Sequence, residues 1–133
     1  MNRFTRRTMT IAAAGVIALS ALTACGAAEQ AMDCANLVSV VEGAAGAIGG
    51  DPSSVKAQSD KLREQANGIG DADLASAVNT LADSLDRLAT LQDKSINNPT
   101  SLTSQEMSEL SALPGKITDQ VGTISGKCTD VTS

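Results

Sequence analysis

The rhythm of apolar residues between positions 71 and 93 is the feature that most constrains the fold. Five apolar residues recur there in steps of four and three: Leu74, Val78, Leu81, Leu85 and Leu88. Steps of this size place side chains on one side of an α-helix, whereas a strand would alternate every second residue. Asp71 stands at the expected N-cap position. The pattern predicts a helix over 71–93 whose single apolar seam packs against neighbouring helices.

Three other segments have the same helical period, at 33–48, 52–68 and 103–128. Asp33 is the expected N-cap of the first, and Asp51-Pro52 gives the second an N-cap followed by proline at the first helical position. The apolar positions of the first segment are Cys34, Leu37, Val38, Val41, Ala45 and Ile48. Within the helices, Lys56 with Asp60 and Asp83 with Arg87 are spaced four apart, which allows ion pairs along one helix.

The segment 103–128 begins with Thr103 and Glu106, which have the spacing of a capping box. Pro114-Gly115 interrupts the apolar pattern, so we expect a kink or a break at Leu113. Gly122 and Gly126 have the spacing that lets two helices approach closely. The small residues expected to lie opposite them are Ala44, Ala45 and Ala47.

Four helices joined by short connections favour an all-α fold, an antiparallel up-down four-helix bundle. In that arrangement Cys34, in the first turn of the first helix, and Cys128, at the end of the fourth, meet at the same pole. We expect a disulfide between them that closes the bundle. A disulfide that closes a loop of roughly 95 residues would stabilise the folded state by about 4–5 kcal/mol in the chain-entropy model.

The first 25 residues have the pattern of an export signal. Arg3, Arg6 and Arg7 precede an apolar run, 9–24, that ends on small residues and a cysteine, Leu22-Thr23-Ala24-Cys25. This segment resembles the signal peptide and lipobox of bacterial lipoproteins. The resemblance implies that residues 1–24 are cleaved and that Cys25 becomes the first mature residue, carrying a diacylglyceryl group. Residues 25–32 then form a lipidated tether to a helical domain over 33–130.

Two other interpretations of the N-terminal segment remain open: a membrane-spanning anchor and an ordinary secretory signal. The 16 residues from 9 to 24 would rise about 24 Å as a helix, which is short of the roughly 30 Å hydrocarbon core. The sequence Thr5-Arg6-Arg7 also leaves open whether export follows the general or the twin-arginine route.

Composition narrows the possible chemistry. All 15 acidic residues follow position 24, while three of the ten basic ones precede it, so the mature charge is 7 − 15 = −8. This charge opposes binding to nucleic acid. Phe4 is the only aromatic residue and the chain has no histidine, so we expect no imidazole base, no imidazole metal ligand and no stacking platform. The sequence therefore predicts neither catalytic, cofactor-binding nor metal-binding residues.

The mature chain, with four predicted helices and one cysteine near each end of the helical domain, also resembles small exported all-helical actinobacterial proteins, some of which carry haem. Histidine and tyrosine, the usual haem ligands, are missing from the mature chain, and with Cys34 and Cys128 paired only Met32 and Met107 remain as soft ligands. We therefore do not expect haem binding.

The sequence as a whole predicts a small, non-enzymatic envelope lipoprotein of actinobacterial type. The lipid on Cys25 would hold it on the extracytoplasmic face of the cell membrane. The helical domain would serve as a protein-interaction or structural module. The alternative is a carrier that holds a small apolar ligand between its aliphatic helices.

Overall fold

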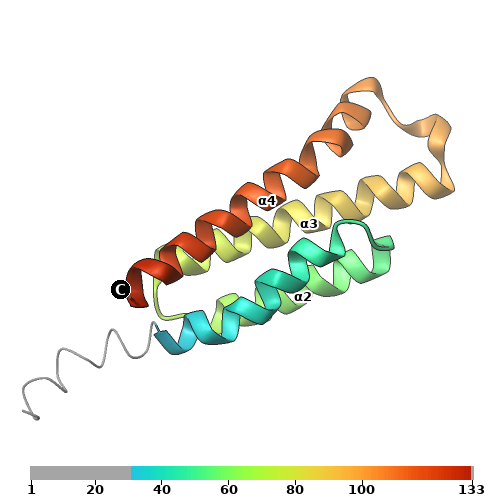
Figure 1. Ribbon diagram of the computed structural model, residues 1–133. Helices are drawn as coiled ribbons and strands as arrows, with labels where there is room; N and C mark the ends of the chain where they lie inside the picture. The colour runs from blue at the N-terminus through green and yellow to red at the C-terminus, as the bar shows by residue number, and fades with distance from the viewer. Residues whose placement is uncertain (1–30, 133) are drawn as a thin grey trace, which may run out of the picture.

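The computed structural model describes residues 31–132, and this part of the chain is all-helical and contains no strand (Figure 1). A first helix covers residues 31–47 and is followed by α2 (Pro52–Gly68), α3 (Ala72–Asn97), the short 3-10 helix η1 (Pro99–Ser101) and α4 (Ser104–Thr132). The predicted all-α class and the four helical segments are confirmed. None of the described helices is both long and apolar enough to cross a bilayer.

The starts of three helices agree with the sequence. The Asp71 carboxylate accepts a hydrogen bond from the Leu74 N–H at 2.8 Å and caps α3. Thr103 and Glu106 form the predicted capping box: the Thr103 N–H donates to Glu106, and the Glu106 N–H donates to the Thr103 hydroxyl. Pro52 occupies the first position of α2, where its missing N–H costs no helical hydrogen bond.

Asp33 is not the N-cap that the sequence predicted. It lies inside the first helix, and its carboxylate accepts a hydrogen bond from the Gly70 N–H at 3.3 Å. The buried line of this helix also differs from the predicted one. Ala44 is completely buried, whereas Val38 is 51% exposed and Ala45 is exposed. A helix of 3.6 residues per turn keeps Cys34, Leu37, Val41 and Ala44 on one side, which places Val38 at its edge.

The core is built around α3, which packs against both α2 and α4 (Figure 1). The five leucines and valines that the sequence singled out in α3 are all at most 1% exposed. They are joined by buried residues from the other helices, among them Val41, Val55, Leu62, Ile117 and Ile124. The apolar seam of α3 is therefore the centre of the domain, as its period predicted.

Pro114 lies inside α4, which runs without a break from Ser104 to Thr132. Of the kink or break predicted at Leu113, the break is therefore wrong. Proline removes one N–H from the helix ladder and crowds the preceding turn. Leu113 and Ile117 on either side are 4% and 0% exposed, so core packing holds both halves of the helix in place despite this cost.

The glycines of α4 do not make the close helix contact that the sequence predicted. A Cβ built on Gly122 or Gly126 would meet no atom within 4 Å, and both residues are exposed. The close approach lies elsewhere. A Cβ on Gly43 would come within 2.7 Å of Gln58 Nε2, and that amide donates to the Val40 carbonyl at 2.6 Å. Gly43 thus makes room for the hydrogen bond that joins the first helix to α2.

The α3–α4 pair extends beyond the first helix and α2 at the end that carries η1 (Figure 1). The lengths explain this difference, since α3 has 26 residues and α2 has 17. We call this projecting end, residues 94–106, the tip. At the opposite end Cys34 and Cys128 lie at disulfide distance, with sulfurs 2.11 Å apart and Cα atoms 5.4 Å apart.

Candidate functional site

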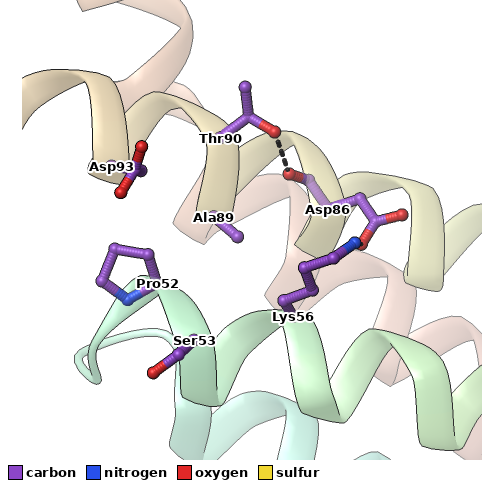
Figure 2. A pocket seen from close by; sticks show the side chains of 7 residues that line it. All are labelled: Pro52, Ser53, Lys56, Asp86, Ala89, Thr90 and Asp93. Atoms are coloured by element: carbon purple, nitrogen blue, oxygen red, sulfur yellow. Dashed lines mark hydrogen bonds and ion pairs between the residues drawn. The ribbon is translucent and has the colours of Figure 1, made fainter.

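An open groove runs between the start of α2 and the second half of α3 (Figure 2). Its volume is about 460 Å³, and its lining residues are Pro52, Ser53, Lys56, Asp86, Ala89, Thr90 and Asp93. The two helices supply opposite charges to the groove, because Lys56 comes from α2 and both carboxylates come from α3. We call it the α2–α3 groove.

Asp86 is the most constrained charged group of the α2–α3 groove. It forms an ion pair with Arg63, and the Lys56 ammonium lies 3.8 Å from Asp86 Oδ1. Burial raises the pKa of the Asp86 carboxyl, but Arg63 and Lys56 together outweigh it and hold that pKa below its usual value. Asp86 is therefore an ionised, neutralised structural group and a poor general base.

Ser59 lies beneath this cluster and is completely buried. Its hydroxyl donates to the Ala82 carbonyl at 3.0 Å and accepts from Arg63 Nη1 at 2.9 Å. Arg63 also reaches Asp83 at 2.8 Å. One serine thus fixes the guanidinium that neutralises two α3 carboxylates.

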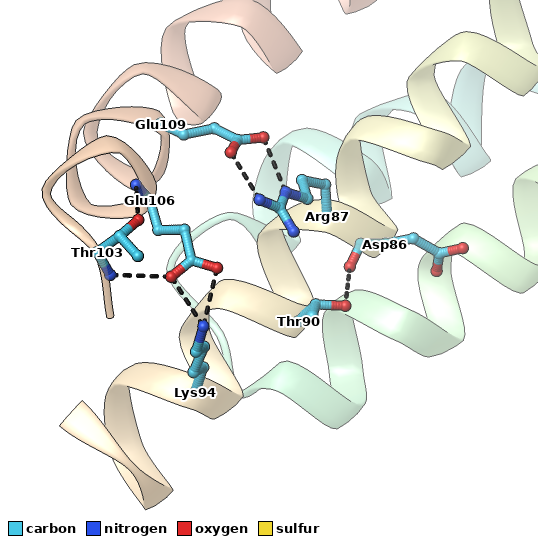
Figure 3. A network of polar contacts seen from close by, with 7 residues as sticks. All are labelled: Asp86, Arg87, Thr90, Lys94, Thr103, Glu106 and Glu109. Atoms are coloured by element: carbon cyan, nitrogen blue, oxygen red, sulfur yellow. Dashed lines mark hydrogen bonds and ion pairs between the residues drawn. The ribbon is translucent and has the colours of Figure 1, made fainter. Parts of the chain in front are cut away.

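A second polar network joins α3 to α4 towards the tip (Figure 3). Arg87 donates two hydrogen bonds to Glu109, each of 2.8 Å, and Lys94 pairs with Glu106 at 2.8 Å. Arg87 lowers the pKa of Glu109, and Lys94 followed by the Thr103 N–H lowers the pKa of Glu106. These contacts hold the ends of the two helices together.

The charged pairs differ from those that sequence spacing suggested. Asp83 and Arg87 do not pair with each other, since each bonds to a different neighbouring helix. Lys56 likewise contacts Asp86 on α3. Spacing along one helix says which residues share a face but not what the next helix presents there, so sequence reasoning missed both networks.

Two further depressions border α4. A polar groove of about 310 Å³ lies against α3 and is lined by Asp73, Ser76, Ala77, Thr80, Gln120, Thr123 and Lys127. A smaller crevice of about 60 Å³ separates α4 from the first helix and is mostly apolar: Leu37, Val38, Val41, Glu42, Val121, Ile124, Ser125 and Cys128 line it. We call the second one the lateral crevice. It is far too small to enclose haem or a ligand of similar size.

The sequence-predicted residues are partly brought together. Cys34 and Cys128 meet, as expected, while Cys25 lies outside the described residues. Met32 and Met107 are 68% and 50% exposed. Met32 precedes Cys34 by two residues in the first helix. Met107 precedes Cys128, the partner of Cys34, by 128 − 107 = 21 residues of α4, which is about 31 Å of helix. They cannot share one iron.

The polar side chains within residues 31–132 are arranged for contacts at the surface of the domain. No group of three or more histidine, cysteine or acidic side chains is placed there to hold a metal ion. In the α2–α3 groove Lys56 pairs with Asp86, and Asp93 accepts a hydrogen bond from the Asn97 amide, so the groove offers polar contact.

Comparison with known proteins gives no further guide to the function. No protein-family profile matches the chain, and no curated protein or solved structure is significantly similar to it.

Proposed function

We propose that the chain is a non-enzymatic lipoprotein of the bacterial envelope, held on the extracytoplasmic face of the cell membrane by a lipid on Cys25. The observation that carries the proposal is the pairing of the cysteines. Cys34 and Cys128 lie at disulfide distance, which suits an oxidising compartment. The third cysteine follows Leu22-Thr23-Ala24, the place that a lipobox requires.

We further propose that the four helices form an antiparallel up-down bundle. The contacts between α2 and α3 support this order, because Lys56 meets Asp86 whereas Ser59, later in α2, meets Ala82, earlier in α3. Between α3 and α4 the order is also reversed: Arg87 meets Glu109, and the later Lys94 meets the earlier Glu106. Such a bundle would place the cysteine pole nearest the membrane and the tip farthest from it.

The bundle would act as a protein-interaction or structural module. Its acidic mature surface suits a soluble body held above the membrane by lipid rather than by a basic patch. The α2–α3 groove also supports this interpretation, because the ion pair between Lys56 and Asp86 joins its two helices.

Membrane attachment is tested with the full chain expressed in a bacterium that processes lipoproteins. We expect the wild-type protein in the membrane fraction, with an N-terminal peptide that begins at Cys25 and carries the added mass of a diacylglyceryl group. Cys25→Ser should be released from the membrane or remain unprocessed. A Ser39→Ala variant, exposed on the first helix, is the matched control. Unchanged membrane retention of Cys25→Ser would overturn the lipid anchor.

The module function is tested by affinity purification of the intact lipoprotein from solubilised membranes. The proposal expects the same envelope protein to be recovered in independent preparations. It should be lost from at least one of three surface variants: Lys56→Glu in the α2–α3 groove, Ile96→Asp at the tip, or Val38→Asn beside the lateral crevice. Repeated recovery of the lipoprotein alone would argue against a protein-interaction role.

A further inference from the structure

The surface between the first helix and α4 differs from the rest of this acidic protein. The lateral crevice lies at its centre, and of the residues that line the crevice Glu42 alone is charged. Val38 at the rim is 51% exposed although it is a large apolar residue. Ala35 and Ala45 are also exposed on the first helix, at spacings from Val38 that place all three on nearly the same side.

The α4 side of this surface is made of small uncharged residues. Thr118, Gly122, Ser125 and Thr129 succeed one another at helical spacings of four, three and four. The Thr118 hydroxyl donates to the Pro114 carbonyl and the Thr129 hydroxyl to the Ser125 carbonyl. The hydroxyls of these two threonines are thus bonded to their own helix. Gly122 adds no side chain, and a Cβ there would meet nothing within 4 Å.

The dimensions of the surface match those of a helix. From Ala31 to Ala45 the first helix has 45 − 31 = 14 steps, about 21 Å at the helical rise. The crevice of about 60 Å³ has room for one small aliphatic side chain, since a water molecule takes about 30 Å³ of liquid volume. A partner that lies along this face therefore needs small or aliphatic residues at helical spacing.

We propose that the lateral crevice and its rims are the docking surface for an amphipathic helix of another envelope protein, with a small aliphatic face and a basic residue opposite Glu42. This inference rests on the proposed function and names the chemistry of the partner. Burial of apolar surface would supply the affinity, and the Glu42 carboxylate would select a cation on the partner.

Charge and length distinguish this occupant from two others. A second copy of the chain would bring a second Glu42 to the same face and no cation to meet it, so self-association leaves two carboxylates facing each other. After cleavage at the lipobox, only six residues, 25–30, precede the first described residue, about 9 Å of helix. As a helix they are too short to cover a face of about 21 Å.

The experiment uses the full chain, purified from its host in detergent micelles, and two 14-residue helical peptides. Both peptides carry alanine and leucine on one face; one has a central lysine and the other a central glutamate. We expect saturable binding by fluorescence anisotropy, at least tenfold tighter for the lysine peptide. Glu42→Arg should reverse this preference. Gly122→Leu should weaken binding at least tenfold because its side chain blocks the face without touching the protein's own core.

Ala57→Leu is the matched control, because Ala57 is exposed on α2, and it should bind both peptides as wild type does. Thermal unfolding checks that each variant is folded. If Gly122→Leu does not fold, Val38→Asn takes its place as the blocking variant, because it makes the rim of the crevice polar. The proposal is overturned if neither peptide binds at millimolar concentration, or if the blocking variant binds as wild type does. Concentration-dependent dimerisation that Gly122→Leu abolishes would assign the face to a second copy instead. These outcomes are independent of whether Cys25 carries lipid.

Discussion

Ser59 and Glu106 hold elements together at the scale of single residues. Ser59 is buried and links α2 to the Ala82 carbonyl of α3 while accepting from Arg63. Glu106 closes the capping box of α4 and pairs with Lys94 of α3. Each side chain makes one contact within its own helix and one with the next, so each connects local structure to packing.

The Ser59→Ala variant should unfold more easily than wild type. It removes the hydroxyl that donates to Ala82 and that receives the Arg63 guanidinium, and a buried hydrogen bond of this kind contributes about 1 kcal/mol. Urea denaturation should therefore give a free energy of unfolding lower by about 1 kcal/mol. Ser53→Ala, on the exposed start of α2, should change it little. Equal stability of the two variants would contradict the linking role of Ser59.

The stability of the domain should depend on pH through the two glutamates that join α3 to α4. The pKa values of Glu106 and Glu109 in the folded protein lie below their ordinary value of 4.5, so the unfolded chain binds protons more readily. The stabilisation is complete above pH 4.5 and is lost as the pH falls below it. The melting temperature of wild type should therefore fall on acidification through this range.

Glu106→Gln tests the assignment of this acid effect. Glutamine can still cap the Thr103 N–H, but it cannot titrate or pair with Lys94 as an ion. We expect a lower melting temperature at pH 7 and a shallower fall below pH 4.5. Lys94→Met should cause a similar loss at pH 7, and the double variant should lose less than the sum of the two. Fully additive losses would show that the two residues are not coupled.

At the scale of elements, α4 is a helix with an outer side on which nothing packs closely among the described residues. Pro114 interrupts the hydrogen bonding of α4 without ending the helix, and a Cβ built on any of the three glycines that follow it would meet no atom within 4 Å. The helix is retained because Leu113, Ile117 and Ile124 are buried. Tertiary packing rather than helix propensity therefore sets the length of α4.

Gly126→Ala should stabilise the protein. The new methyl group would meet no atom within 4 Å, and replacing a mid-helix glycine by alanine typically contributes about 0.5–1 kcal/mol. We expect that gain in the free energy of unfolding from urea denaturation. Gly43→Ala is the contrasting variant, because its methyl group would displace the Gln58 amide, and it should gain less or lose stability. Destabilisation by Gly126→Ala would mean that a neighbouring helix does pack on this residue.

The elements were predictable where one helix carries its own signal, and less so where two helices decide together. The leucine period marked α3, and Asp71, Thr103 and Glu106 marked helix starts. The end of α3 was expected at 93, because Ser95–Asn97 has the composition of a loop. The helix instead ends at Asn97, and the ion pair between Lys94 and Glu106 of the next helix holds this last turn in place. The rotation of each helix about its axis also depends on its neighbours, which is why Val38 and Gly122 were assigned to the inside.

At the scale of the whole molecule, the Cys34–Cys128 link joins the first helix to the last. It closes a loop with a sequence separation of 94, and it was predicted from the cysteine positions together with the expected order of the helices. The grooves beside α2, α3 and α4 were not predictable, because each is formed by residues from two helices. The core is aliphatic and has no aromatic residue among its buried side chains, so a covalent link of this reach has a large share in its stability.

Removing the link should therefore destabilise the domain strongly. For Cys34→Ala with Cys128→Ala we expect a loss of about 4–5 kcal/mol in the free energy of unfolding, which follows from the loop length. Urea denaturation of the double variant measures it, and wild type treated with a reducing agent should show a similar loss. A loss below about 1 kcal/mol in both cases would show that the link adds little to the helical packing.

The same link determines how the molecule would respond to mechanical force. Tension applied between the N-terminal side of Cys34 and the C-terminus enters the domain before Cys34 and leaves it after Cys128, so the load passes through the two sulfur atoms and not through the helices between them. In a single-molecule stretching experiment the chain between the two cysteines, with its separation of 94 residues, would contribute no extension until the bond is reduced. The domain would keep its shape under a pull that unravels an open bundle.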